Sequence, residues 1–149
     1  MKNINPALKD LEPFVGKWDM ELSNAAFLPD PKATVHADVS FEWIENGAFF
    51  AMSQGNNAAP ERAIWVIGRD DKEKNYTILY SDARGVSRIY EMSFEKNVWK
   101  IWRNSPGFSQ RYEGKVSKDK KTITAHWEKS FDGKKWEHDF DLKYAKNRR

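Results

Sequence analysis

Apolar and polar residues alternate with a period of two along most of the chain. The clearest run lies at residues 35–43, where apolar side chains occupy the odd positions and polar side chains the even ones. Successive side chains of a β-strand point to opposite faces, so this alternation predicts strands with one buried face. On this basis strands are predicted at residues 17–22, 35–43, 48–54, 63–69, 76–81, 86–94, 98–103, 108–116, 122–130 and 136–144.

Turn-forming residues separate these predicted strands. Asn46-Gly47 suits the positive φ angles of a tight hairpin turn, and residues 104–107, Asn-Ser-Pro-Gly, give another strong turn signal. Short turns join antiparallel neighbours, whereas parallel strands need long crossovers that are usually helical. No helical pattern interrupts the strands after residue 16. The sequence therefore predicts an antiparallel meander.

One short helix is predicted before the strands. Asn5 can cap it, and Pro6 occupies the first helical position, where its missing N–H removes no hydrogen bond. Pro13 and Gly16 end the helix. Its apolar residues are Ala7, Leu8, Leu11 and Phe14.

A meander of this many strands either leaves two unpaired edges or closes on itself. Closure removes the aggregation hazard of an exposed edge. The sequence therefore predicts an all-β, antiparallel up-and-down barrel of about 8–10 strands, preceded by a short N-terminal helix. The length of 149 residues fits a single domain spanning residues 1–149.

The junction of helix and first strand carries a family resemblance. Residues 14–18, Phe-Val-Gly-Lys-Trp, resemble the opening of the calycins, which comprise the lipocalins and the fatty-acid-binding proteins. In those families a Gly-x-Trp enters the first strand, and the resemblance implies that Trp18 closes one end of a calycin-like barrel. Residues 81–90, 110–114 and 127–136 are similar to an uncharacterised calycin-like group, a domain of unknown function. This resemblance implies a fold and assigns no activity.

The composition narrows the chemistry. Seven Trp, nine Phe and five Tyr make up 14% of the chain, and they can fill a core or line a cavity. The chain contains no cysteine, which excludes disulfides and thiolate-ligated metals. No segment is apolar enough for a signal peptide or a membrane span, so we expect a cytoplasmic protein without a membrane partner.

Nucleic acid is not the expected partner. Residues 99–103, Trp-Lys-Ile-Trp-Arg, interleave aromatic and basic side chains, a pattern that suits stacking on single-stranded bases. However, the net charge is only +3 and no basic stripe is present. The basic residues of segment 143–149 are either a solvated end or a phosphate contact. A homodimer is left open.

Arg88 is the most informative polar residue. It falls on the apolar face of the predicted strand 86–94, between Val86 and Tyr90. Burying a guanidinium is unfavourable unless it is paired. Two interpretations follow: an internal ion pair, for example with Asp82, or an anchor for the carboxylate of a ligand.

Other polar groups are predicted to share this interior. Tyr80, Gln110 and Tyr112 fall on inward faces, and their polar atoms can orient a ligand or satisfy one another. In fatty-acid-binding proteins an Arg and a Tyr on late strands clamp a carboxylate, but alternation places Arg111 on the face opposite Tyr112. The predicted ligand site is lined by Arg88, Tyr90, Tyr80, Tyr112, Gln110, Trp65, Trp136 and His138.

His138 raises an alternative with a cofactor. The nitrobindins, a related calycin-like group, hold haem through a histidine on a late strand, and the alternation predicts that His138 faces inward. The glycine-rich opening strand of that group is missing here, and a hydrogen-bonded core histidine is the competing interpretation. No His-x-His or His-Glu-x-x-His spacing predicts a metal site.

The sequence favours a binding protein over an enzyme. No Gly-x-Ser-x-Gly, P-loop or dinucleotide motif is present. We therefore expect a carrier or sensor of a small apolar or anionic ligand, with no cofactor. Haem binding and a small enzyme that uses the same cavity for acid–base chemistry are the alternatives.

Overall fold

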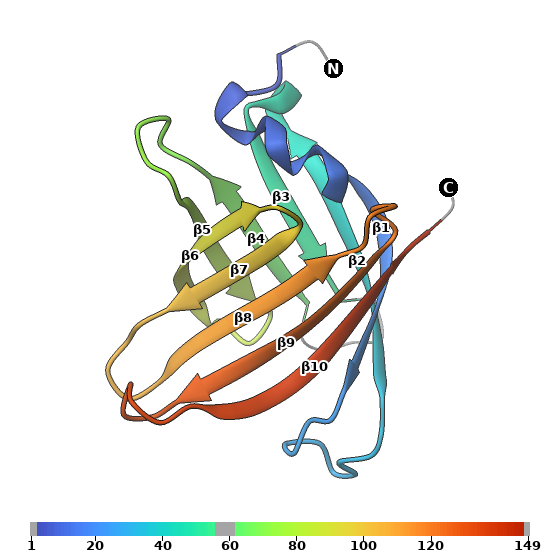
Figure 1. The fold of residues 1–149 in the computed structure, drawn as a ribbon, viewed down its shortest axis with the longest axis vertical. Coiled ribbons are helices and arrows are strands. Elements are labelled where there is room, and N and C mark those ends of the chain that lie inside the picture. The colour runs from blue at the N-terminus through green and yellow to red at the C-terminus, as the bar shows by residue number, and fades with distance from the viewer. Residues whose placement is uncertain (1–2, 56–61, 148–149) are drawn as a thin grey trace.

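The computed structural model describes residues 3–55 and 62–147. In this part of the chain, ten antiparallel strands form one closed barrel, as Figure 1 shows. Each strand pairs with the next along the chain, and the last pairs with the first, which confirms the predicted all-β antiparallel barrel. The strands are β1 Gly16–Ser23, β2 Val35–Ile44, β3 Phe49–Gln54, β4 Ala63–Gly68, β5 Tyr76–Asp82, β6 Ser87–Glu95, β7 Val98–Arg103, β8 Ser109–Val116, β9 Thr122–Ser130 and β10 Glu137–Lys146.

The pairing of β1 with both β2 and β10 closes the sheet. Met20 lies opposite Ala37 of β2 on one side and opposite Tyr144 of β10 on the other. Closure leaves none of the described strands with an unpaired edge. The inward-facing apolar residues of all ten strands thus contribute to one enclosed core.

The helix before β1 is η1, Pro6–Phe14, a 3-10 helix. Asn5 caps it as predicted, because its side-chain oxygen accepts a hydrogen bond from the Ala7 N–H at 3.0 Å. Pro13 lies inside the helix and has no N–H to donate, which disfavours a longer α-helical ladder. Among the described residues, no helix has the length and apolarity that crossing a membrane requires.

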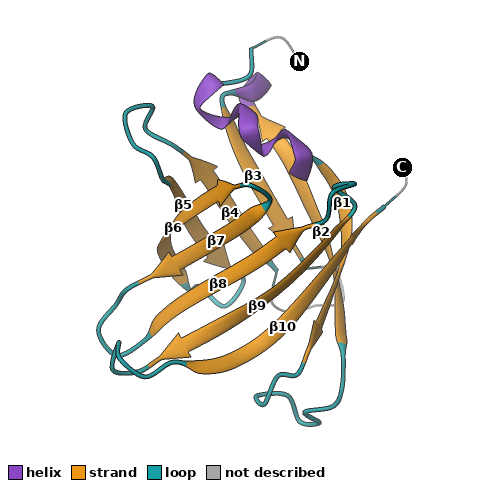
Figure 2. Cartoon of the chain, viewed as in Figure 1, coloured by secondary structure: helices purple, strands orange, loops and turns teal. Residues whose placement is uncertain are grey.

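Helix η1 covers one end of the barrel (Figure 2). Its last residue, Phe14, packs its ring against Phe41, Phe94 and Trp99, with centroid distances of 5.2, 4.8 and 4.9 Å. Trp18 is 1% exposed, and its indole N–H donates a hydrogen bond to the Phe14 carbonyl at 2.8 Å. Aromatic packing therefore seals the end of the barrel on which η1 lies.

Strand β10 departs from simple alternation at its start. His138 lies opposite Glu128 of β9, but Phe140 lies opposite Trp127, the very next residue of that strand. One extra residue, Asp139, is therefore inserted between them as a β-bulge. Because side chains alternate between the two faces, one extra residue reverses which positions before the bulge face inward, compared with the alternation that holds after it.

This bulge makes the predicted inward positions of His138 and Trp136 wrong. The His138 side chain is 47% exposed, and its Nε2 lies 2.8 Å from Asp141 Oδ1. Trp136 precedes β10, and the Arg111 guanidinium lies 4.1 Å from its ring centroid. Because Arg111 lies on the outer face of β8, Trp136 is also outside the barrel.

Candidate functional site

A cavity of about 500 Å³ lies inside the barrel, in the half remote from η1. Residues at its mouth come from one set of strand connections: Phe27 between β1 and β2, Arg84 between β5 and β6, and Phe108 between β7 and β8. The β2–β3 turn lies at the other end, where the Gly47 carbonyl accepts a hydrogen bond from the Asn5 N–H. The volume falls within the range typical of small-molecule sites.

Aromatic side chains make up much of the cavity wall. The centroid of the Trp65 ring lies 4.6 Å from that of Tyr80, 5.4 Å from that of Tyr90 and 6.3 Å from that of Trp127. The Trp65 N–H donates to Gln54 Oε1 at 3.1 Å, so this indole is satisfied. The aromatic residues therefore both fill the sealed end and line the open half. The other apolar lining residues include Met20, Leu22, Met52, Ile101, Phe140 and Leu142.

A polar cluster links β6 to β8 across this wall. The Tyr90 hydroxyl donates to Gln110 Oε1 at 2.8 Å, and Arg88 Nη1 donates to the same oxygen at 3.3 Å. The Arg88 guanidinium also lies 5.4 Å from the centroid of the Phe108 ring. Burial raises the pKa of Tyr90, so its hydroxyl stays protonated and acts as a donor. Gln110 is neutral and leaves the charge of Arg88 uncompensated.

No carboxylate within the described residues lies at ion-pair distance from Arg88. The predicted alternative, an ion pair with Asp82, is wrong because Asp82 binds other partners. Arg84 donates to its carboxylate at 2.7 Å, and the Tyr80 hydroxyl donates to it at 2.6 Å. Hydrogen bonds from Arg84 and Tyr80 lower the pKa of Asp82. Burial and the bond to Asp82 raise the pKa of Tyr80.

The mouth thus contains one compensated and one uncompensated arginine. Asp82 neutralises the charge of Arg84, whereas Arg88 has only an amide and an aromatic face as partners. Asp139, the bulge residue, also lines the cavity, but its carboxylate lies 3.5 Å from Lys129 Nζ. An anion that enters the cavity would therefore meet its strongest attraction at Arg88.

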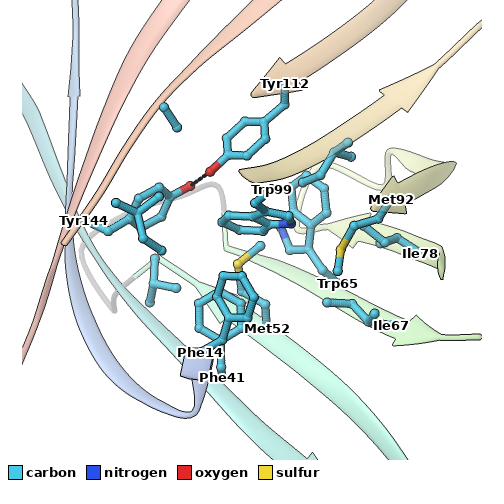
Figure 3. Close-up of a cluster of buried hydrophobic side chains, with 14 of the residues drawn as sticks. Phe14, Phe41, Met52, Trp65, Ile67, Ile78, Met92, Trp99, Tyr112 and Tyr144 are labelled. Atoms are coloured by element: carbon cyan, nitrogen blue, oxygen red, sulfur yellow. Dashed lines mark hydrogen bonds between the residues drawn. The ribbon is translucent and has the colours of Figure 1, made fainter. Parts of the chain in front are cut away.

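Three residues with polar groups, Trp99, Tyr112 and Tyr144, lie among apolar neighbours in the buried cluster of Figure 3, and all three line the cavity. The Tyr112 hydroxyl donates to the Tyr144 hydroxyl at 3.3 Å, and the two rings lie beside Trp99. Burial raises the pKa of both tyrosines, so both remain neutral. Trp99 is 1% exposed, and its Nε1 is the single buried side-chain polar atom without a hydrogen-bond partner in the described residues.

The structure brings together most of the residues that the sequence predicted for the site. Those that line the cavity are Arg88, Tyr90, Tyr80, Tyr112, Gln110 and Trp65, whereas Trp136 and His138 lie outside it. Trp99, Trp127 and Tyr144 line the cavity but were not predicted as site residues. Alternation places Trp99 on the inward face of β7, and that position is the only signal in the sequence that could have identified it.

The histidines do not support the haem alternative. His36 approaches Glu21 at 3.8 Å, His126 approaches Glu128 at 4.0 Å, and His138 pairs with Asp141 on the outer face of the barrel. The cavity lining includes none of the three. An axial histidine ligand inside the barrel therefore does not fit the side chains present. Within the described residues, no group of three or more His, Cys, Asp or Glu side chains is placed to hold a metal ion.

Comparison with known proteins supports the fold and goes no further. No family model matches the chain, and no curated protein matches its sequence. The crystal structure of Rv2717c from M. tuberculosis matches with a TM-score of 0.69 over 98% of this chain and 100% of that one. The two sequences are 11% identical, so this chain is similar to Rv2717c in the architecture of its barrel.

Proposed function

We propose that this chain forms a calycin-like barrel that binds a small amphipathic ligand, with an apolar body against the aromatic wall and an anionic group at Arg88. One observation carries the proposal: the wall of a cavity of about 500 Å³ contains a half-buried arginine without a carboxylate partner among the described residues. The ligand would supply the negative charge that pairs with the Arg88 guanidinium.

Burying a cation without an anionic partner is electrostatically unfavourable. A guanidinium that leaves water loses hydration, and a single neutral amide oxygen compensates only part of that loss. Arg88 nevertheless lies on the cavity side of β6, beside Tyr90. A carboxylate or sulfonate could accept two parallel hydrogen bonds from the guanidinium, a geometry that suits arginine better than lysine.

The ionisable groups of the cavity are better suited to holding a ligand than to transferring protons. Burial raises the pKa of Tyr90 and Tyr112, which keeps both hydroxyls protonated near neutral pH. The carboxylates of Asp82 and Asp139 are each paired with a cation. A general base poised near the working pH is not among these groups. Binding without chemistry is therefore the function we propose.

Two fluorescent probes with the same ring system test this proposal. 1-Anilinonaphthalene-8-sulfonate carries an anionic group, and N-phenyl-1-naphthylamine has the same rings without it. We expect both to bind, and Arg88→Met to weaken the sulfonate probe by about tenfold to a hundredfold, since a hydrogen bond to a charged group contributes about 1.5–3 kcal/mol. The neutral probe should lose much less affinity.

Arg111→Met is the matched control, because Arg111 lies on the outer face of β8 and pairs with Glu128. It should leave the affinity of both probes unchanged. Equal losses for the two probes in Arg88→Met would show that Arg88 acts through the structure and not as an anion anchor. Failure of both probes to bind the native protein would contradict the proposed function itself.

A further inference from the structure

We propose a second subsite at the floor of the cavity, which recognises a neutral hydrogen-bond acceptor such as a ketone oxygen through Trp99 and the Tyr112–Tyr144 pair. This inference rests on the proposed function and deepens it. It states what the inner end of the ligand must offer, whereas Arg88 selects only the outer end.

The first observation is the unpaired indole of Trp99. Its Nε1 is buried without a hydrogen-bond partner in the part of the chain that the structure describes, and Trp99 lines the cavity. Leaving a buried N–H unpaired costs about 1–3 kcal/mol. By contrast, the indole N–H of Trp18 donates to the Phe14 carbonyl, and that of Trp65 donates to the Gln54 side chain. A ligand oxygen at Trp99 would recover this cost.

The second observation is a donor left over in the tyrosine pair. Tyr112 donates its hydroxyl hydrogen to Tyr144, so the hydrogen of the Tyr144 hydroxyl has no acceptor within the described residues. Two phenols that share one hydrogen bond always retain one O–H to donate. The rings of Tyr112 and Tyr144 lie 4.9 and 6.1 Å from that of Trp99. The floor therefore has two unused donors in one small region.

The third observation is that these donors carry no charge. Burial raises the pKa of Tyr112 and Tyr144, and the side chains packed beside them and Trp99 are apolar or aromatic. A carboxylate at the floor would lose its hydration without pairing with a cation. Nearer the mouth it could pair with the Arg88 guanidinium. A carbonyl or ether oxygen loses far less on burial. The floor should therefore select a neutral acceptor and the mouth an anion.

Together the two subsites define a ligand class. The ligand would have an apolar, preferably aromatic or alicyclic, body with an oxygen acceptor at its inner end and an acidic group at its outer end. Discrimination at the inner end arises because an analogue without the oxygen leaves the two donors unpaired. Oxo-substituted ring acids have this chemistry.

Two neutral probes, which cannot form an ion pair with Arg88, test the subsite at the floor separately from the anion anchor. 2-Acetylnaphthalene and 2-ethylnaphthalene have nearly the same shape, and only the first has a carbonyl oxygen. We expect the ketone to bind about tenfold more tightly, the equivalent of about 1.4 kcal/mol, as measured by quenching of tryptophan fluorescence. Trp99→Phe should reduce this preference, and so should the double variant Tyr112→Phe/Tyr144→Phe, because either single Tyr→Phe substitution leaves the other hydroxyl free to donate. Trp102→Phe, on the outer face of the same strand, should retain it, because its indole donates to Glu91.

A second readout requires no substitution. The infrared stretch of a ¹³C-labelled carbonyl moves to lower frequency when the oxygen accepts hydrogen bonds, so we expect this shift for 2-acetylnaphthalene bound to the native protein. Equal affinity for the two naphthalenes, or a bound carbonyl with the frequency seen in hydrocarbon, would contradict the subsite. So would failure of the ketone to bind while 1-anilinonaphthalene-8-sulfonate binds. Failure of all four probes would contradict the proposed function as well.

Discussion

The Tyr90 hydroxyl of β6 donates to the Gln110 side-chain oxygen of β8 at 2.8 Å, so a hydrogen bond reaches across the intervening strand β7. The same oxygen accepts from Arg88. Gln110 therefore positions the guanidinium without neutralising it. The difference between a neutral amide and a carboxylate at this position should decide whether the cavity attracts anions.

Gln110→Glu is expected to abolish that attraction. The new carboxylate would pair with Arg88 and supply the charge proposed to come from the ligand. We expect the affinity for 1-anilinonaphthalene-8-sulfonate to fall at least about tenfold, while that for N-phenyl-1-naphthylamine changes much less. Fluorescence titration measures both. Unchanged affinity for the sulfonate would contradict the role of Arg88 as the anion anchor.

Substitution of His138 should leave ligand binding intact. Its side chain lies outside the barrel and contacts Asp141, not the cavity. We expect His138→Ala to bind both fluorescent probes as the native chain does and to give the same absorption spectrum after addition of haemin. A band in the Soret region that is present in the native protein and lost in His138→Ala would contradict the expectation that this histidine takes no part in binding.

The ion pair at Asp82 should make stability depend on pH in acid. Hydrogen bonds from Arg84 and Tyr80 lower the pKa of Asp82 in the folded chain below its value of 3.8 in the unfolded chain. The folded state therefore holds fewer protons on this group, and its stabilising contribution is complete above that value and is lost as the pH falls through the folded-state pKa.

Asp82→Asn should lower the free energy of unfolding at neutral pH, and its difference from the native protein should shrink as the pH falls below about 4. Urea denaturation at a series of pH values measures this. Asp71→Asn removes an exposed carboxylate from the β4–β5 turn and should parallel the native curve. A difference for Asp82→Asn that stays constant down to pH about 2 would contradict the ion pair.

Phe14 should account for much of the stability of the sealed end. Its ring is 2% exposed and packs against Phe41, Phe94 and Trp99. Phe14→Ala should lower the free energy of unfolding by about 3–5 kcal/mol, because it leaves a cavity among rigid rings. Ile89→Ala, at a site 58% exposed on the outer face, should change it by about 0.5 kcal/mol or less. Urea denaturation compares the two.

Most of the fold could be predicted because burial on one face imposes a period of two. The predicted strand 122–130 agrees with β9, and 98–103 agrees with β7. The error in β10 has a physical reason. The bulge at Asp139 is specified by pairing with β9, and no glycine in the His138–Phe140 segment signals it. One inserted residue was enough to place His138 and Trp136 on the wrong face.

The cavity was less predictable than the strands that surround it. Alternation could indicate that Arg88, Tyr90 and Gln110 face inward, since each follows the period of its own strand. It could not indicate which partners they meet, because those lie on other strands. Trp99 is an example. It is a candidate site residue because its buried indole N–H has no hydrogen-bond partner among the described residues, and only the three-dimensional structure shows which groups surround that N–H.

The pairing of β1 with β10 has a consequence for how the chain folds. Trp18 lies opposite Lys146, so the first strand completes its hydrogen bonding only with the last. Such contacts between distant segments raise contact order, and topologies rich in them fold slowly, because loop-closure entropy is lost before the contacts compensate for it. During synthesis on the ribosome, one edge of β1 stays unpaired until β10 has emerged. The barrel therefore cannot close before the last strand has been synthesised.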